Sequence, residues 1–173
     1  NMLCDPGVFL DTLSKLKVNN KWNLDNNWIE QNISEKKKWI DKSLKDLEKE
    51  TIKAKKNGGK IHPLQLALDV QDAMKDNDWL VIDGGNTHFW SEIAINIAGH
   101  KGKKLGGILH PGTFSMLGVG VPFALSAKNL NPKSNVVLIS GDGAFLSGGL
   151  SIEAAFQENK PIIVVIDNNG GLD

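Results

Sequence analysis

The sequence has few features typical of secreted, membrane-bound or nucleic-acid-binding proteins. Cys4 is the only cysteine in 173 residues, which excludes an internal disulfide and favours a reducing compartment. Lys plus Arg and Asp plus Glu both number 20, so no excess of charge points to nucleic acid. The longest apolar runs, such as PIIVVI, are far shorter than the ~18 residues of a membrane span, and the first residues show no signal-peptide pattern. We therefore expect a soluble, cytoplasmic protein that acts on small molecules, with neither nucleic acid nor a membrane as partner.

Hydrophobic periodicity separates a helical first third from an alternating remainder. Between Asp25 and Asn57 apolar residues recur every three or four positions, which predicts an amphipathic helix or helix pair with the Lys run 36–38 on its solvated face. From about residue 60, apolar runs ending in glycines alternate with helical segments such as SMLGVGVPFALSAKNL. This alternation predicts an α/β fold, with a parallel sheet covered by helices on both faces. We expect the runs VVLIS and PIIVVI to be neighbouring central strands of that sheet.

Polar, glycine-containing turns follow three of the predicted strands, in the segments DGGNTHFW, GDGAF and DNNGG. Ligands of parallel α/β sheets bind beyond the carboxyl ends of the strands, so we expect Asp142 and Asn169 at one edge. A carboxylate, an amide oxygen and an exposed peptide carbonyl make half of the oxygen shell that Mg²⁺ prefers. A diphosphate would supply further ligands, and Thr87 together with the helix after GDG would supply donors to it.

Simpler explanations apply to each of these residues taken alone. Asp142 and Asn169 can cap or bridge turns. Asp167 ends a strand where a ribose-binding acid could lie, but the dinucleotide fingerprint G-x-G-x-x-G fails because its third glycine position is Leu146. Met116 and Leu117 can be ordinary core residues of a helix.

The four histidines divide into two pairs. His88 falls in the predicted diphosphate loop and is a candidate for ligand contact, whereas His110 is a candidate for facing the substrate. His62 and His100 are most simply structural or exposed.

The segment GDGAFLSGGLSIEAAFQENKPIIVVIDNN resembles the signature of thiamine-diphosphate-dependent enzymes, in which NN follows GDG after one helix and one strand. The segments IHPLQLALDVQDAM, WLVIDGGNTHFW and SMLGVGVPFALSAKNL are similar to parts of the acetolactate synthase large subunit and its relatives, benzaldehyde lyase and oxalyl-CoA decarboxylase. The resemblance implies Mg²⁺ ligation by the side chains of Asp142 and Asn169 and by the carbonyl of Gly171. It also implies that thiamine diphosphate contacts Asn86, Thr87, His88, Ser115, Leu117, Gly141, Gly143 and Ala144. In the family a bulky apolar residue at the position of Leu117 supports the bent cofactor.

The resemblance also implies a domain organisation. Residues 1–20 would end a preceding middle domain, 21–59 would form a helical linker, and 60–173 would form a thiamine-diphosphate-binding domain that is incomplete at its C-terminus. The family's activating glutamate belongs to a further domain, so we assign no catalytic residue here. We expect these 173 residues alone to be inactive and to bind cofactor weakly or not at all. The parent enzyme is expected to be a homodimer or homotetramer that decarboxylates or ligates small 2-oxo acids or acyl-CoA-type substrates.

The sequence departs from acetolactate synthases in places that bear on substrate. Where they carry Gln-His-Gln-Met-Trp, this chain has the run Asn86 to Trp90, and only the tryptophan matches. The stretch TFSMLGVG also differs from their usual Gly-Thr-Met-Gly. A non-catalytic interaction module, or a decayed relative of the family, is the alternative hypothesis.

Overall fold

Two units make up the chain, Asn1–Lys42 and Ser43–Asp173, and the computed structural model describes residues 5–19, 25–56 and 59–171. Helix α1 (Pro6–Asn19) lies in the first unit, and α2 (Asn26–Lys56) runs from the first unit into the second. The segment predicted as a helix or helix pair is therefore one helix, and its Lys run 36–38 is exposed, as predicted. Cys4 lies outside the described residues. Within the described part of the chain, no helix has both the length and the apolar character needed to cross a bilayer.

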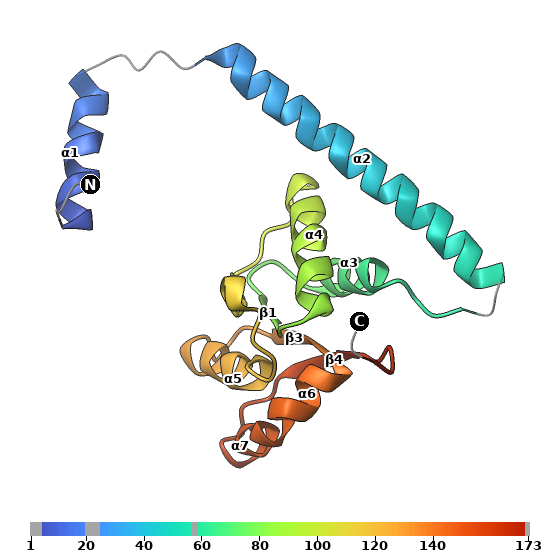
Figure 1. Cartoon of the computed structure of the whole chain (residues 1–173). Coiled ribbons are helices and arrows are strands. Elements are labelled where there is room, and N and C mark those ends of the chain that lie inside the picture. Colours follow the sequence, from blue (N-terminus) through green and yellow to red (C-terminus); the bar gives the residue numbers. More distant parts are fainter. Residues whose placement is uncertain (1–4, 20–24, 57–58, 172–173) are drawn as a thin grey trace. The chain divides into compact units, whose positions relative to one another are not determined.

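The second unit is built on a parallel four-stranded sheet, which confirms the predicted α/β class (Figure 1). Its strands are β1 (Trp79–Ile82), β2 (Gly107–Leu109), β3 (Val136–Gly141) and β4 (Ile163–Asp167), in the spatial order β2-β1-β3-β4. The central strands β1 and β3 are almost entirely buried, because helices cover both of their faces.

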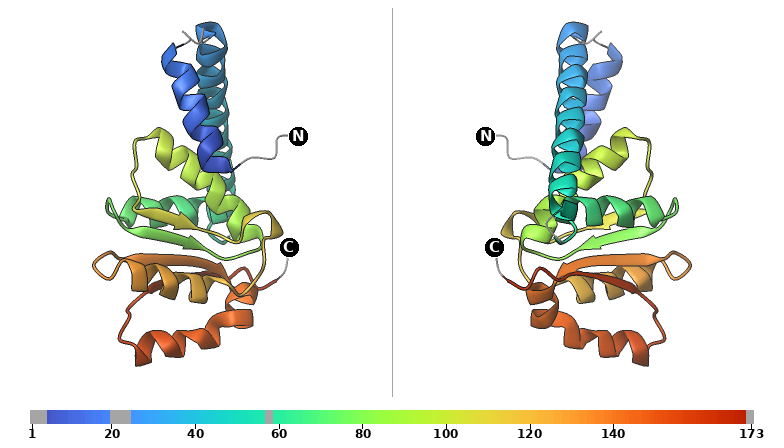
Figure 2. Two further views of the ribbon diagram at one scale, coloured as in Figure 1. Left: turned by 90° about the vertical axis from the view of Figure 1, so that its left-hand side faces the viewer. Right: turned by 90° about the vertical axis from the view of Figure 1, so that its right-hand side faces the viewer.

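Helices form a layer on each side of the sheet (Figure 2). Helices α3 (Pro63–Ala73) and α4 (Asn86–His100) cover one face. Helices α5 (Gly120–Leu130), α6 (Asp142–Gly148) and α7 (Ile152–Gln157) cover the other, and short 3₁₀ turns lie at Gly112–Phe114 and Gly149–Ser151. The core between the sheet and α5 consists of Val81, Val121, Ala124, Ala127, Val136 and Leu138.

Two local expectations were wrong. The runs VVLIS and PIIVVI are neighbours, but β4 is an edge strand of the described sheet, with Ile163 and Ile166 52% and 42% exposed. An apolar run has the same composition in a central strand and in an edge strand, so composition could not separate the two. The helix predicted from Ser115 begins only at Gly120, because Ser115 and Gly118 have φ values of 45° and 84°, which an α-helix cannot accommodate.

A buried carboxylate, that of Asp83, joins the end of β1 to its neighbours. Asp83 is 1% exposed. Its Oδ1 accepts hydrogen bonds from the amides of Gly84 and Gly118, both at 2.9 Å, and its Oδ2 accepts one from Ser140 Oγ at 3.0 Å. These three bonds connect the end of β1, the end of β3 and the loop before α5. Gly120 packs on the same carboxylate, since a Cβ there would lie 2.7 Å from Oδ2.

We predict that Asp83→Ala lowers the free energy of unfolding by about 2–4 kcal/mol, because it leaves buried donors without acceptors. Asp83→Asn should cost less than half as much. Its amide oxygen can still accept from Gly84 and Gly118, and its NH₂ group can donate to Ser140 Oγ, whose hydroxyl then donates to Gly141 O. Urea unfolding of both variants tests this. If both variants lost the same free energy of unfolding, the hydrogen bonds of Asp83 would not explain its contribution to stability.

Gly84 lies where the end of β1 touches the loop before α5. A Cβ on Gly84 would lie 2.2 Å from the carbonyl oxygen of Ser115 and 2.4 Å from that of Met116, so backbone would have to move. We predict that Gly84→Ala destabilises the fold by about 1–3 kcal/mol or displaces this loop. Gly99→Ala is the matched control, because no atom lies within 4 Å of its added Cβ and alanine favours the helix. Thermal unfolding compares the stability of the two variants. If Gly84→Ala were as stable as Gly99→Ala, the close approach of Gly84 to the carbonyls of Ser115 and Met116 would be contradicted.

Candidate cofactor site

The order of the strands creates a crevice between β1 and β3. The chain leaves β1 for α4 on one face of the sheet and leaves β3 for α6 on the other, so their carboxyl ends diverge. Such switch points are where open α/β sheets bind ligands. A cavity of about 360 Å³ lies there, a size typical of ligand sites. It is lined by Gly84, Gly85, Asn86, Thr87, Ser115, Leu117, Gly141, Asp142, Gly143, Ala144, Asn169 and Gly171.

The residues predicted for the site meet at this cavity, with one exception. All three predicted metal ligands line it, and so do the predicted cofactor contacts apart from His88. The parallel register explains the meeting, because Gly141 pairs with Asp167 and the turns after β3 and β4 therefore lie side by side. Sequence analysis did not single out Gly84 and Gly85, although both belong to the turn that it placed at this edge.

Two carboxylates, those of Asp142 and Asp167, interact where β3 and β4 end. The carboxylate of Asp142 has no hydrogen-bond or ion-pair partner among the described residues. Partial burial, followed by the negative charge of Asp142, raises the pKa of Asp167 above its ordinary value, although His62 acts in the opposite direction. A cation beside Asp142 would relieve this repulsion.

The turn after β4 holds oxygen atoms in a defined arrangement. Asn169 Oδ1 accepts a hydrogen bond from the amide of Gly171 at 3.1 Å, and the carbonyl of Asn169 accepts one from Lys60 Nζ at 2.7 Å. Gly170 has a φ of 75°, a conformation that glycine adopts without strain. An amide oxygen has two lone pairs, so the side chain of Asn169 keeps one for a ligand.

The loop before α5 forms the opposite wall. Ser115 Oγ accepts a hydrogen bond from the amide of Gly85 at 3.0 Å, which ties this loop to the turn after β1. Met116 and Leu117 are 61% and 40% exposed, so the alternative that they are core residues of a helix is wrong. Leu117 lines the cavity instead.

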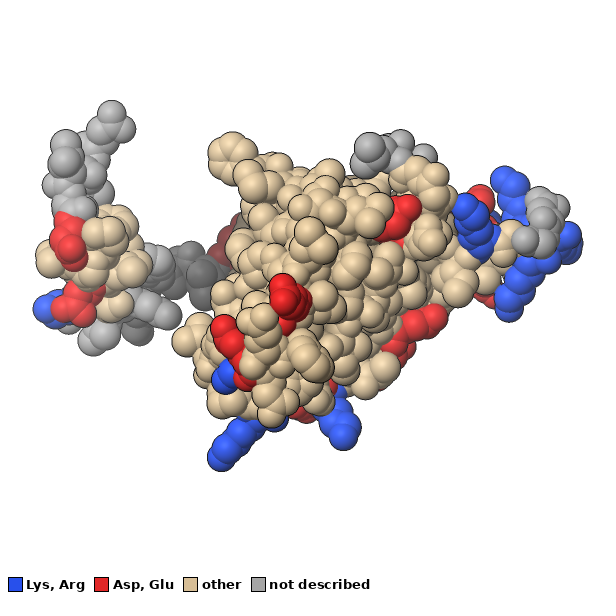
Figure 3. Space-filling model, turned by 90° about the horizontal axis from the view of Figure 1, so that it is seen from below, with Lys and Arg blue, Asp and Glu red and all other residues tan. Residues whose placement is uncertain are grey.

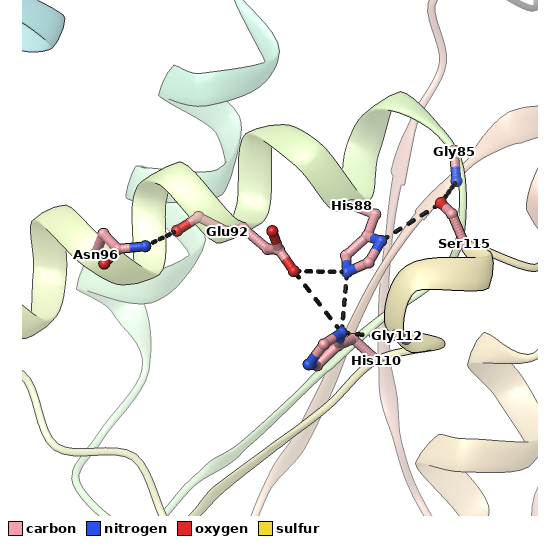
Figure 4. A network of polar contacts seen from close by, with 7 residues as sticks. All are labelled: Gly85, His88, Glu92, Asn96, His110, Gly112 and Ser115. Atoms are coloured by element: carbon pink, nitrogen blue, oxygen red, sulfur yellow. Dashed lines mark hydrogen bonds and ion pairs between the residues drawn. The ribbon is translucent and has the colours of Figure 1, made fainter.

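His88 lies behind this wall rather than in the cavity. Its Nδ1 is 3.4 Å from Ser115 Oγ, and its Nε2 is 3.0 Å from both Glu92 Oε1 and His110 Nδ1 (Figure 4). His110 therefore contacts this cluster, and it is not among the residues that line the cavity. Sequence analysis missed Glu92, whose signal was its position one helical turn after His88.

The other two histidines are structural or exposed, as predicted. His62 is the N-cap of α3, where its Nδ1 accepts from the amide of Leu64 at 3.1 Å, and its ring packs edge-on against Trp90. His100 ends α4 and is exposed.

Comparison with known proteins identifies the family to which this part of the chain is similar. Residues 83–173, more than half of the chain, match the family described as thiamine pyrophosphate enzyme, C-terminal TPP binding domain. The cavity-lining residues all lie within that range.

Named relatives differ in the reactions their names describe. The chain is 32% identical to human 2-hydroxyacyl-CoA lyase 2 over 64% of its own length and 17% of that protein. It is 31% identical to the catabolic acetolactate synthase of Raoultella terrigena, over 61% of the chain and 18% of the relative. It is 34% identical to oxalyl-CoA decarboxylase of Escherichia coli K12, over 60% of the chain and 18% of the relative.

A solved structure supports the fold. The thiamine diphosphate-dependent 4-hydroxybenzoylformate decarboxylase of Rhodococcus jostii RHA1 superposes with a TM-score of 0.51 at 25% identity, over 64% of this chain and 20% of that one. The chain spans about a fifth of the length of the curated relatives it matches. It belongs to the thiamine pyrophosphate enzymes and carries their C-terminal TPP-binding domain.

Proposed function

We propose that this chain holds the diphosphate of thiamine diphosphate, together with Mg²⁺, in the cavity between β1 and β3. The observation that carries the proposal is the meeting of Asp142, Asn169 and the turn after β1 around one cavity at the switch point of the sheet. The donor set fits the metal, because Mg²⁺ takes carboxylate, amide and carbonyl oxygens and keeps positions for phosphate and water.

The metal would be held by the Asp142 carboxylate, the Asn169 side-chain oxygen and the Gly171 carbonyl. Asp142 supplies the negative charge, and its carboxylate has no competing partner among the described residues. Asn169 would share its oxygen with the amide of Gly171, which already orients that oxygen. A cation here would also offset the repulsion between Asp142 and Asp167.

The diphosphate would be held mainly by backbone groups. Gly143 and Ala144 lie in the first turn of α6, where amides have no acceptor within the helix, and both line the cavity. Thr87, in the first turn of α4, adds a hydroxyl from the opposite side. Gly141 permits the two turns to approach, since a Cβ there would lie 3.2 Å from Thr87 Oγ1.

The loop before α5 would hold the rest of the cofactor. Leu117 is the bulky apolar residue at the cavity wall, and we propose that it supports the cofactor from below. Ser115 and Leu117 would contact the aminopyrimidine ring through backbone carbonyl and amide. When bound, thiamine diphosphate supplies the electron sink for cleaving or forming bonds next to a carbonyl. This chain's residues would bind it, orient it and limit the access of water.

The reaction of the whole protein is proposed as decarboxylation or carboligation of small 2-oxo acids or acyl-CoA-type substrates, as in acetolactate synthases. The names of the relatives support this range. We also propose a homodimeric or homotetrameric parent in which another domain or subunit covers the cavity. In support, Phe114 and Met116 beside the cavity are 89% and 61% exposed. In the view from below in Figure 3, acidic and basic side chains are scattered and form no single charged patch.

We predict that Asp142→Ala weakens Mg²⁺-dependent binding of thiamine diphosphate at least ten-fold, because the only anionic protein ligand is lost. Asn169→Ala should be milder and should recover with excess Mg²⁺, since water can replace a neutral ligand. NMR titration of the chain with thiamine diphosphate, with and without Mg²⁺, measures these affinities and also detects weak binding.

Two controls accompany this titration. Asp72→Ala removes an exposed carboxylate on α3 and should leave binding unchanged. Thiamine without its diphosphate should bind more weakly and without a need for Mg²⁺. Equal affinity in Asp142→Ala and the unmodified chain would reject the metal assignment. Tight binding by these 173 residues alone would contradict the expectation that a further domain completes the cofactor site.

A further inference from the structure

Three side chains beside the cavity, those of His88, Glu92 and His110, converge on one point (Figure 4). His88 and Glu92 lie one turn apart on α4 and so share a face of that helix, and His110 follows β2. The Nε2 of His88 is 3.0 Å from Glu92 Oε1 and 3.0 Å from His110 Nδ1, and the latter two atoms are 3.8 Å apart. Three potential ligand atoms from two elements therefore form a small triangle.

The size of this triangle suits a transition-metal ion. With sides of 3.0, 3.0 and 3.8 Å, the point equidistant from the three atoms lies about 1.9 Å from each, close to the ~2.0–2.2 Å at which zinc binds imidazole nitrogen and carboxylate oxygen. An ion slightly out of the plane would reach all three atoms without movement of the backbone.

The atoms that face one another in this cluster are mostly hydrogen-bond acceptors. The amide of Gly112 donates to His110 Nδ1 at 3.3 Å, so that nitrogen carries a lone pair rather than a proton, and a metal ion would replace this long hydrogen bond. Glu92 Oε1 is also an acceptor. A neutral His88 has one N–H, and a proton on Nε2 would be shared between two acceptors.

The surroundings of His88 are compatible with the tautomer that binds a metal. Its Nδ1 lies 3.4 Å from Ser115 Oγ, which can accept the Nδ1 proton and leave the lone pair on Nε2 facing Glu92 and His110. A hydrogen bond to the second ring nitrogen is the usual support of a metal-binding histidine. The side chain of His88 is only 10% exposed, whereas those of His110 and Glu92 are 40% and 52% exposed. His88 is therefore held in place by its burial, and the exposed side of the cluster, at His110 and Glu92, leaves room for water or a further ligand.

We propose that His88, Glu92 and His110 form a binding site for a divalent transition-metal ion of the zinc type, separate from the Mg²⁺ ligands proposed at Asp142 and Asn169. Two imidazoles and one carboxylate favour Zn²⁺, Co²⁺ or Ni²⁺ over Mg²⁺, which prefers oxygen ligands. Occupancy would fix the tautomer of His88 and thereby the position of Ser115, whose Oγ holds the amide of Gly85 at the cavity wall. The site would thus couple a second metal to the shape of the cofactor cavity.

Titration of the full chain with Co²⁺, followed by its visible absorption, and with Zn²⁺ by calorimetry tests this. We expect one Zn²⁺ per chain at micromolar concentration, no displacement by millimolar Mg²⁺, and at least ten-fold weaker binding in His110→Ala and in Glu92→Gln. Both substitutions change partly exposed side chains, so the fold should survive, and circular dichroism verifies this. In NMR spectra, Zn²⁺ should shift the Nε2 resonance of His88 and the Nδ1 resonance of His110.

His100→Ala is the matched control, because it removes an exposed histidine at the other end of α4 and should leave Zn²⁺ affinity unchanged. Asp142→Asn should also leave it unchanged, so failure of this proposal and failure of the Mg²⁺ site are separable. Absence of Zn²⁺ binding at micromolar concentration, or equal affinity in His110→Ala and the unmodified chain, would show that the cluster is only hydrogen-bonded.

Discussion

The rest of the site depends on the hydrogen bonds that the buried carboxylate of Asp83 accepts. It is buried at the end of β1, and its three hydrogen bonds hold together the turn after β1, the end of β3 and the loop before α5. Each of these segments contributes a wall of the cavity. A buried carboxylate is costly unless its oxygens are well bonded, and that requirement gives the arrangement its specificity. Movement of any one segment would leave the others with unpaired donors or acceptors.

The cavity follows from this anchoring and from the order of the strands. Because β1 and β3 are neighbours whose following helices lie on opposite faces, a crevice opens at their carboxyl ends. Asp142 begins the helix after β3, and the register of β3 with β4 brings the turn that carries Asn169 alongside. The hydrogen bond between Ser115 and Gly85 then links the cavity wall to the histidine cluster on α4. The two proposed metal sites thus lie on either side of one loop.

Much of this site could be predicted from the sequence, because Asp142 and Asn169 each follow a strand of a parallel sheet and such strand ends meet at one edge. The edge position of β4 could not be predicted, since an apolar run does not reveal how many neighbours a strand has. The backbone from Ser115 to Gly118 looked helical, and only its contacts with Gly84 and Asp83 explain the positive φ values. The cluster of His88, Glu92 and His110 could not be predicted, because it depends on the pairing of β2 with β1. No local sequence pattern specifies that pairing.

The central claim is that the turns after β1, β3 and β4 form a Mg²⁺ and diphosphate site. Crystals of the protein grown with thiamine diphosphate and Mn²⁺, with diffraction recorded at the manganese absorption edge, test it most directly, because Mn²⁺ replaces Mg²⁺ and scatters anomalously. The account predicts an anomalous peak within bonding distance of the Asp142 carboxylate and the Asn169 side-chain oxygen, with diphosphate density beside Gly143. A bound cofactor with its metal elsewhere, or a peak only at His88 and His110, would contradict it.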